Sequence, residues 1–286
     1  EQQTALSGEL EKLIALFGKI NSEVAPLELS GSGTASNPYI VSSAAEWATV
    51  CGKNRYGNLT AHIKLSNNID LSATEFYSAN LKGSLNGDGH TISGLTKPLF
   101  NGLNGATVKN LAIVGAAITG GSGQNTGILA KYTDTNAVTI QNCYVSGSIT
   151  GSGKGIGGLI GQIGTTTAIT NCAADVTVRN TQTGKYSFGA GGLVGYVTGS
   201  NLLTISHCYA TGTAITGARL AGGFVGNAQY SNTTITIDHS VALQSEVSNG
   251  DDKSYEGRIV SSATYFKTDT LTNNCAYADL EGAKQP

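Results

Sequence analysis

The four histidines of the chain are the first residues to consider for chemistry, because imidazole binds metals and transfers protons near neutral pH. They are His62, His90, His207 and His239, and none lies in a His-Glu-any-any-His pattern, so the zinc-peptidase signature is absent. His207 and His239 occupy equivalent repeat positions, close to Asp238. Zinc sites need three or four ligands, and the other residues at this repeat position are Asn. The sequence therefore favours a structural role for both histidines and predicts no metal site.

Paired carboxylates are the second source of chemistry, because glycosidases use two acids about 5 to 9.5 Å apart. On a repeat fold, such a pair requires acids at matching positions of neighbouring repeats. Asp134, Asp175 and Asp238 occupy different positions, and no cluster of oxygen ligands with a Lys or Arg base is evident for a calcium-dependent lyase. A glycan-active enzyme, either a polysaccharide lyase or a glycosidase, is therefore the alternative function and not the favoured one.

Signatures of other enzyme classes are absent or have a structural explanation. Gly153, Gly155 and Gly158 match a dinucleotide-binding pattern, but no helix pattern follows them and a repeat corner accounts for the glycines. The chain has no Gly-Lys-Ser/Thr element of a P-loop and no Gly-any-Ser-any-Gly element of a serine hydrolase. The sequence therefore predicts no catalytic residue and no cofactor.

Composition excludes further classes of protein. Charged residues make up only 13%, with 17 Lys plus Arg against 19 Asp plus Glu, which argues against nucleic acid as a partner. Apolar stretches end well before the roughly 18 residues of a transmembrane segment. The chain starts at Glu1 and contains no Met, so a targeting segment or an anchor upstream of Glu1 is compatible with the sequence. The five Cys recur too regularly for a disulfide framework and are expected to stack as core thiols.

Two motifs recur along the chain and define the elements that carry these residues. The first is glycine-rich and advances by 31 or 34 residues over its first four copies: 126–129, 157–161, 191–195, 222–226 and, degraded, 257–260. The second follows each copy of the first: Ile140-Gln141-Asn142-Cys143, Ile169-Thr170-Asn171-Cys172, Ile205-Ser206-His207-Cys208, Ile237-Asp238-His239-Ser240 and Thr272-Asn273-Asn274-Cys275, with Val108-Lys109-Asn110-Leu111 as a weaker early copy. Such periods indicate repeated units that bury their apolar faces against each other.

The repeat length favours an all-β fold, a right-handed parallel β-helix (solenoid) of roughly six coils with a short N-terminal α-helix. Each unit offers about three short strands, whereas a propeller blade needs four strands in about 40 or more residues. Coils about 4.8 Å apart would stack equivalent residues in columns. The expected columns are an aliphatic one (Val108, Ile140, Ile169, Ile205, Ile237), a small-residue one (Leu111, Cys143, Cys172, Cys208, Ser240, Cys275) and a polar ladder (Asn110, Asn142, Asn171, His207, His239, Asn274). The paired glycines are expected at corners, where φ is positive or backbones approach closely.

Three segments are expected within this architecture. Residues 1–29 carry Leu6, Leu10, Leu13 and Phe17 at coiled-coil spacing, and the helix is either a stalk that oligomerises or a cap on the open end of the β-structure. Residues 30–97 form the irregular N-terminal part of the β-helix, with a brief helix whose capping box is Ser43 to Glu46. Residues 98–286 form the repeat coils, in one continuous domain with residues 30–97.

At these motifs the chain resembles the bacterial GLUG-repeat family, in the copies Gly158-Leu159-Ile160-Gly161 and Gly192-Leu193-Val194-Gly195. The second half of the family repeat is matched by residues 140–147 and 205–212, with His207 in place of Asn. The resemblance covers about residues 98–279 and implies a β-helical protein that is secreted or displayed on a bacterial surface. Such repeats occur in adhesin-like proteins and as appendages of immunoglobulin A-cleaving metallopeptidases, and the repeat residues are structural.

The favoured function at this stage is a non-enzymatic, adhesin-like binding or structural module on the cell surface, with a glycan or host extracellular protein as partner. Outward residues such as Thr170, Thr177, Tyr144 and Tyr209 could contact such a ligand, but strands are rich in Thr and Tyr without one. The ligand-binding residues are therefore unknown from sequence. An oligomer formed through residues 1–29 is the other expected association.

Overall fold

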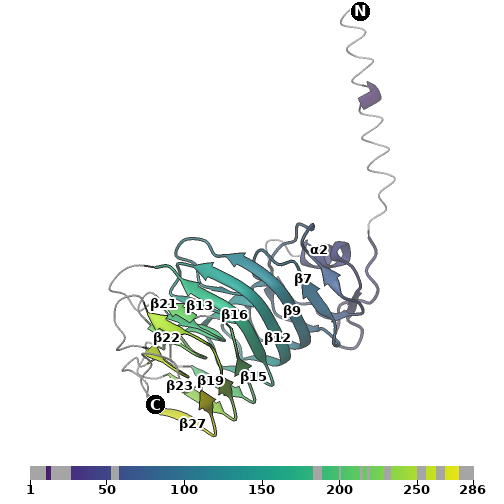
Figure 1. The fold of residues 1–286 in the computed structure, drawn as a ribbon. Helices are drawn as coiled ribbons and strands as arrows, with labels where there is room; N and C mark the ends of the chain where they lie inside the picture. Colours follow the sequence, from purple (N-terminus) through teal and green to yellow (C-terminus); the bar gives the residue numbers. More distant parts are fainter. Residues whose placement is uncertain are drawn as a thin grey trace, which may run out of the picture.

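The computed structural model describes residues 11–13, 27–52, 58–182, 189–199, 201–212, 215–217, 220–228, 233–249, 256–261 and 268–276. Within these residues the chain consists mostly of β-strands arranged in three sheets (Figure 1). Neighbouring strands pair in parallel, as β12 does with β9, β15 and β16. The expected all-β class is confirmed.

The strands divide among a large sheet and two smaller ones. The largest sheet contains β1 (Tyr39–Val41), β3 (His62–Leu65), β4 (Ile69–Asp70), β6 (Ser84–Asn86), β7 (Thr91–Ser93), β9 (Thr107–Thr119), β12 (Val138–Gly151), β15 (Thr167–Thr170), β16 (Ala173–Asn180), β19 (Leu202–Ser206), β20 (Tyr209–Ala210), β21 (Ile215–Gly217), β23 (Thr234–Asp238), β24 (Val241–Ala242), β25 (Val247–Asn249), β27 (Thr268–Thr272) and β28 (Cys275–Ala276). A second sheet contains β10 (Thr126–Gly127), β13 (Gly155–Gly157), β17 (Gly189–Gly191), β22 (Leu220–Gly222) and β26 (Glu256–Gly257). The third contains β2 (Asn58–Leu59), β5 (Asn80–Leu81), β8 (Phe100–Leu103), β11 (Ala130–Thr133), β14 (Ile160–Ile163) and β18 (Val194–Val197).

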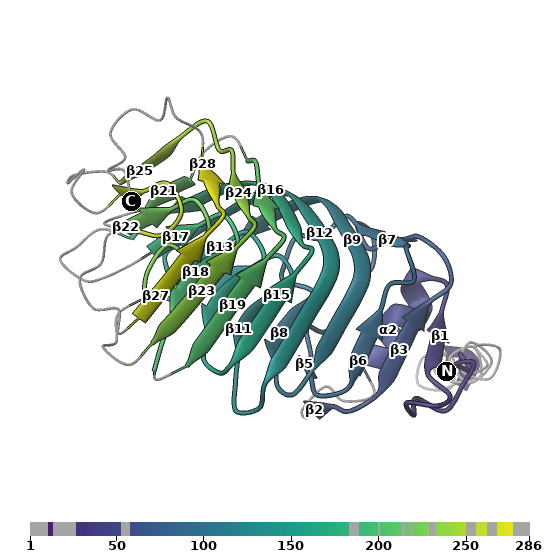
Figure 2. The same ribbon diagram turned by 90° about the horizontal axis from the view of Figure 1, so that it is seen from below.

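Each repeat forms one layer, and equivalent strands of successive layers lie side by side (Figure 2). Ile140 pairs with Val108 on one side and with Ile169 on the other. This confirms the predicted aliphatic column, and the same column extends through earlier and later layers. Its members in chain order are Tyr39, Ile63, Leu85, Val108, Ile140, Ile169, Ile205, Ile237 and Leu271.

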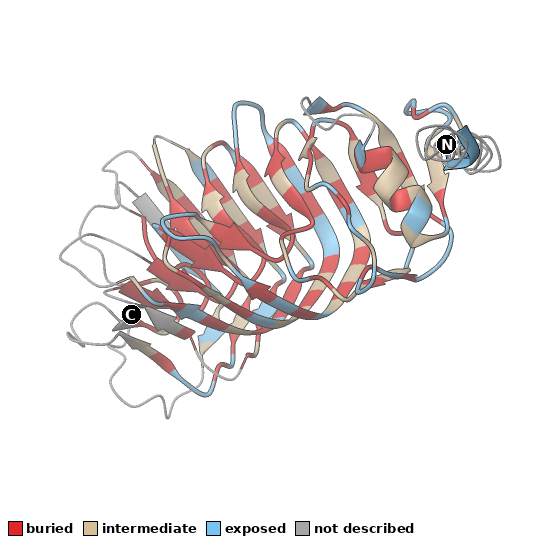
Figure 3. Cartoon of the chain, turned by 90° about the horizontal axis from the view of Figure 1, so that it is seen from above, coloured by how far each residue is buried: buried red, intermediate tan, exposed pale blue. Residues whose placement is uncertain are grey.

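The core lies between the sheets, and Figure 3 shows that every layer contributes buried residues, coloured red. Along β23, buried and half-buried residues alternate because successive side chains of a strand point to opposite faces. The inward residues are mostly Ile, Val, Leu and Ala, whose burial contributes about 25 cal/mol for each Å² of apolar surface removed from water. The repeated aliphatic positions therefore hold the layers together.

The paired glycines of the first motif lie where two backbones approach closely. A Cβ on Gly191 would overlap the carbonyl oxygen of Val194, and a Cβ on Gly192 would overlap the carbonyl oxygen of Gly223 in the next layer. Neither glycine has a positive φ. Of the two expected reasons for these glycines, close approach is therefore the one that applies.

A short helix, α2 (Ala44–Gly52), packs at the N-terminal end of the described layers. The predicted capping box is present, because Glu46 N–H donates to Ser43 Oγ and Ser43 N–H donates to Glu46 Oε2. Trp47 of this helix is buried, with its ring centroid 5.9 Å from that of Phe100. This contact joins the helix to the third sheet.

The expected helix of residues 1–29 falls almost wholly outside the described residues. Residues 11–13 are helical and their side chains are exposed. The choice between a stalk and a cap therefore stays a prediction. Among the described residues, no helix is both long and apolar enough to cross a membrane.

Candidate binding surface along the Asn–His corner

The second motif forms a corner in each layer where the backbone takes a left-handed conformation. Such φ values are costly for most residues, whereas Asn tolerates them because its short side chain hydrogen-bonds locally. The corner is thus the reason that Asn recurs in the motif. The corner residues are Asn110 (φ 54°), Asn142 (52°), Asn171 (51°), His207 (54°), His239 (46°) and Asn273 (55°).

The carboxamides at this corner form a hydrogen-bonded ladder, as predicted. Asn142 Nδ2 donates to Asn110 Oδ1 at 2.9 Å, and Asn171 Nδ2 donates to Asn142 Oδ1 at 3.2 Å. Asn110 Nδ2 continues the ladder to Asn86 Oδ1 at 3.1 Å. Each carboxamide therefore orients the next, and the ladder presents a fixed polar edge.

The last step of the predicted ladder is wrong by one residue. Asp238 pairs with Thr272, and Val241 pairs with Cys275, so Asn273 and not Asn274 takes the corner position. Leu271 pairs with Ile237, so it takes the column position to which the predicted register assigned Thr272. Cys275 accordingly leaves the thiol column and is exposed.

After four of the six corners, the next residue makes a hydrogen bond through a thiol or hydroxyl: Cys143, Cys172, Cys208 and Ser240. Cys172 Sγ donates to the Thr170 carbonyl at 3.2 Å, and the Cys172 N–H donates to Cys208 Sγ in the next layer at 3.3 Å. Cys208 N–H donates in the same way to Ser240 Oγ at 3.1 Å. The hydrogen bond with the Cys143 side chain and burial raise the pKa of the Cys172 thiol to about 12, so this thiol stays protonated at neutral pH. Free, buried thiols are the predicted arrangement for Cys143, Cys172 and Cys208.

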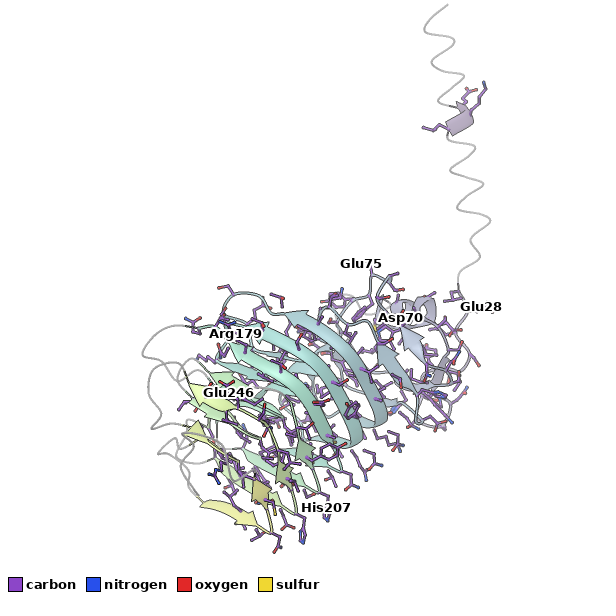
Figure 4. The ribbon with its side chains drawn as sticks, in the orientation of Figure 1. Glu28, Asp70, Glu75, Arg179, His207 and Glu246 are labelled. Atoms are coloured by element: carbon purple, nitrogen blue, oxygen red, sulfur yellow. The ribbon has the colours of Figure 1, made fainter. Side chains whose placement is uncertain are left out.

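The two histidines of the ladder stack on each other. Their ring centroids are 5.2 Å apart and their planes differ by 5°. His239 Nδ1 lies 2.6 Å from Asp238 Oδ2, while Thr272 Oγ1 donates to Asp238 Oδ1 at 2.7 Å. Hydrogen bonds from Thr272 and then from His239 hold the pKa of the Asp238 carboxyl below its usual value. His207 lies at the edge of the stack, away from the other labelled residues (Figure 4).

No described residues gather into a metal-binding cluster. The structure contains no group of three or more His, Cys, Asp or Glu that could hold a metal ion within its described part. Asp175 lies level with Ser146 of the neighbouring layer, so no acid of that layer faces it across the pairing. Figure 4 shows Asp70 and Glu75 near the N-terminal end and Arg179 and Glu246 toward the other end.

Over four successive layers, the row beside the ladder alternates between alanine and tyrosine. Tyr144 pairs with Ala112 and with Ala173, and Ala173 pairs with Tyr209. Sequence reasoning named both tyrosines as outward residues but missed the alternation. The signal was present, because the residue after Leu111, Cys143, Cys172 and Cys208 reads Ala, Tyr, Ala, Tyr.

Two family models match the chain. Residues 55–147 match the N-terminal region of the M26 IgA1-specific metallo-endopeptidases, and residues 152–179 match the GLUG motif. The second match includes the glycine pair Gly157 and Gly158, where an added Cβ would overlap the backbone carbonyl oxygens of Ile160 and Gly192. The chain is a GLUG-repeat protein.

Relatives of this GLUG-repeat protein include proteases that are much longer. An immunoglobulin A1 protease of Streptococcus sanguinis is 34% identical over 141 residues, covering 49% of this chain and 7% of that protein. A halomucin of Haloquadratum walsbyi is 35% identical over 162 residues, covering 46% of this chain and 2% of that protein. The zinc metalloprotease ZmpC of Streptococcus pneumoniae is 30% identical over 174 residues, covering 58% of this chain and 9% of that protein. The GLUG-repeat protein thus spans less than a tenth of these relatives.

Solved structures share the fold. A Bacteroides ovatus protein described as a suggested immunoglobulin A1 protease superposes with a TM-score of 0.73 at 24% identity, over 87% of this chain and 78% of that one. An IgA1 protease structure gives a TM-score of 0.55 at 23% identity, over 85% of this chain and 20% of that one. At these identities the likeness concerns the arrangement of the chain alone.

These relatives correct the functional expectation from sequence. The expectation of a non-enzymatic, adhesin-like protein is wrong, because the matches are to immunoglobulin A1 proteases, to a zinc metalloprotease and to a peptidase N-terminal region. The error has a simple origin. A search for a zinc motif tests only the residues present, and the matching region is an N-terminal region and not a catalytic one. The absence of a His-Glu-any-any-His pattern therefore does not distinguish a protease-related protein from an adhesin.

Proposed function

We propose that the GLUG-repeat protein is the N-terminal, substrate-holding region of an extracellular, protease-related protein of the M26 kind. The observation that carries the proposal is the match of residues 55–147 to the N-terminal region of that family. The repeated alignment with immunoglobulin A1 proteases from streptococci supports it. An immunoglobulin or another secreted glycoprotein is the corresponding substrate, and the cell exterior or cell surface is the corresponding location.

The architecture that we propose for this role is a single right-handed parallel β-helix, with roughly six coils over residues 98–286. Three parallel sheets with one layer per repeat support it, since each layer crosses from sheet to sheet and returns beside its starting strand. Crossovers between parallel strands are nearly always right-handed. Pairing of β1, β3 and β6 with later strands supports one continuous unit over residues 30–286.

The residues of the described part do not fit the zinc ion that the relatives' names imply. Zinc sites use three or four His, Cys, Asp or Glu ligands in close proximity, and no such group is found in the described residues. His207 and His239 stack face to face, and the neighbouring Asp238 already accepts hydrogen bonds from Thr272 and Asn273. We therefore derive no step of peptide hydrolysis from these residues and assign the region a holding role.

A stack of layers suits such a role for physical reasons. Each layer packs only against its neighbours, so the stack forms a long surface of fixed spacing that does not depend on a distant part of the chain. Side chains held by ladders lose little further entropy when they bind a partner.

Oligomerisation through residues 1–29 is a further proposal, and comparing sedimentation of the chain with and without these residues tests it.

The decisive experiment immobilises the purified chain and passes immunoglobulin A1 and immunoglobulin G over it, with and without a zinc chelator. Retained protein is measured by surface plasmon resonance, and the flow-through is analysed for fragments by mass spectrometry. We expect immunoglobulin A1 to be retained intact in both conditions.

Two results would count against the proposal. If neither immunoglobulin A1 nor immunoglobulin G is retained, the chain does not have the substrate-holding role. Fragments that form only without the chelator would place a zinc-dependent hydrolytic site within this chain and end its assignment as a holding region. Bovine serum albumin is the matched protein control, because it tests nonspecific adsorption to the immobilised surface.

A further inference from the structure

An open groove of about 450 Å³ runs beside the Asn ladder, across the layers of β9, β12, β16 and β20. Its floor is formed by Ala112 and Ala173, and Tyr144 and Tyr209 rise from the alternate layers. Asn142 and Asn171 line one edge. The alternation of small and large residues in one row is what creates the hollow.

The two tyrosines are spaced to hold one ring-shaped group between them. Tyr144 and Tyr209 are separated by the layer of Ala173, so their strands are about 9.6 Å apart, twice the strand spacing. A ring midway between them would lie about 4.8 Å from each tyrosine, within the roughly 4.5 to 7 Å typical of stacked ring centroids. Tyr209 is 45% exposed, whereas Ala173 is 5% exposed beneath the gap.

The polar groups of the groove both donate and accept hydrogen bonds. Asn171 Nδ2 donates a hydrogen bond to Asn142 Oδ1, but in the described part of the chain no group donates to Asn171 Oδ1. Across the same residues, neither the Tyr144 hydroxyl nor the Tyr209 hydroxyl hydrogen-bonds within the protein. A ligand with hydroxyl groups satisfies all of these atoms, because a hydroxyl is both donor and acceptor.

The groove carries no charge, since none of its lining residues is Asp, Glu, Lys or Arg. An acidic glycan would have to give up hydration of its carboxylates or sulfates without gaining an ion pair, which costs free energy. The occupant that fits is therefore uncharged.

We propose that this groove binds a neutral oligosaccharide, with one pyranose ring between Tyr144 and Tyr209 and its hydroxyls on Asn142 and Asn171. Polypeptides fit less well. An extended strand repeats its side chains on one face about every 6.7 Å, out of step with the tyrosines. A polyproline II helix repeats about every 9.3 Å, but its prolines have no N–H to donate to Asn171 Oδ1. The proposal is independent of protein-substrate holding.

The test uses the full chain, labelled with a fluorophore, on an array of neutral hexose and N-acetylhexosamine oligosaccharides, acidic oligosaccharides and a polyproline nonapeptide. The best ligand is then titrated by calorimetry against wild-type protein and three variants. Tyr209→Ala removes one wall, and we expect it to weaken binding by about two- to tenfold, a loss that corresponds to one stacked ring contact. Ala173→Tyr fills the gap with a residue that the row already accepts in other layers, and we expect it to abolish binding.

Tyr77→Ala is the matched control, because Tyr77 is 43% exposed and lies outside the groove. It should leave the affinity unchanged, and the thermal midpoint of each variant checks that the fold is intact. The proposal is overturned if no neutral oligosaccharide binds, if acidic oligosaccharides or polyproline bind better, or if Ala173→Tyr binds like wild type. Loss of immunoglobulin retention with intact glycan binding would contradict the proposed function alone.

Discussion

At the residue scale, the corner of each layer accepts only residue types that tolerate a positive φ. Asn is the usual solution, and its carboxamide also extends the ladder to the next layer. The ladder could be predicted from sequence because Asn recurs beside an inward Ile. Its last step could not, because Asn273 and Asn274 are adjacent and only the pairing of Leu271 with Ile237 selects between them. The groove between Tyr144 and Tyr209 was not predicted, although the alternation of Ala and Tyr after the small-residue column is present in the sequence.

The hydrogen bonds of Asp238 predict a pH dependence at the same scale. Hydrogen bonds from Thr272 and then His239 lower the pKa of this carboxyl in the folded state below the ordinary value of 3.8. Its contribution to stability is therefore present above that value and is lost as the pH falls through the lowered folded-state pKa. Asp238→Asn should lower the thermal midpoint near pH 7. Near pH 3 the difference in thermal midpoint between wild type and Asp238→Asn should be smaller.

Thermal midpoints of wild type and variant at both pH values check this prediction. Asp175→Asn is the control, because it removes the charge of another exposed carboxylate. A constant difference between wild type and Asp238→Asn across the pH range would contradict it.

The accessibility of the thiols gives a second residue-scale prediction. Burial raises the pKa of Cys51 to about 12, and Cys143, Cys172 and Cys208 are also buried, whereas Cys275 is exposed. Because the thiolate is the reactive form, an aromatic disulfide reagent near pH 8 should modify one thiol quickly and the others only after unfolding. Cys275→Ser should remove the fast phase, which absorbance of the released thiolate measures. If several thiols of the folded protein react in the fast phase, the reagent reaches the buried cysteines of the small-residue column and the prediction is wrong.

At the element scale, the glycine pairs set how closely the second sheet approaches its neighbours. Sequence identified these positions but left two physical reasons open, and the φ values decide for close backbone approach. That distinction needs coordinates, because both reasons produce the same residue type. It also explains why both positions are glycine in three successive layers, at 157–158, 191–192 and 222–223.

Gly192→Ala tests this explanation. A Cβ there meets the carbonyl oxygen of Gly223, which belongs to the neighbouring backbone and cannot move aside freely. We expect the free energy of unfolding to fall by about 3 kcal/mol, the upper end of overpacking costs. Gly52→Ala is the control, because nothing lies within 4 Å of the added atom. Denaturant titration of the two variants measures the difference, and equal stabilities would argue against close approach as the reason for glycine.

At the scale of the whole molecule, the sequence predicted the all-β class and the layered repeat, because periodicity records which residues stack. It misjudged the function, because repeat residues serve the stack whatever protein carries it. The relation to proteases came from similarity to other chains and not from any residue that performs chemistry here.

Removing one whole layer tests the repeat architecture. Ile160 pairs with Val194, so deleting residues 160–193 joins Leu159 directly to the residue that is equivalent to its former neighbour. Because layers contact only their neighbours, we expect a shorter protein that still unfolds cooperatively, with a β-rich circular dichroism spectrum and a lower thermal midpoint. Deleting residues 160–176 instead breaks the phase of the repeat and should prevent folding. If both deletions behave alike, the layers are not interchangeable.

The parallel registry between layers has a consequence for distance. Every layer adds about 4.8 Å along the axis. Gain or loss of a repeat therefore changes the reach of the molecule in fixed increments while the surface at each end stays the same. The number of repeats, each marked by a glycine-rich motif and a corner residue, therefore sets the length of the stack.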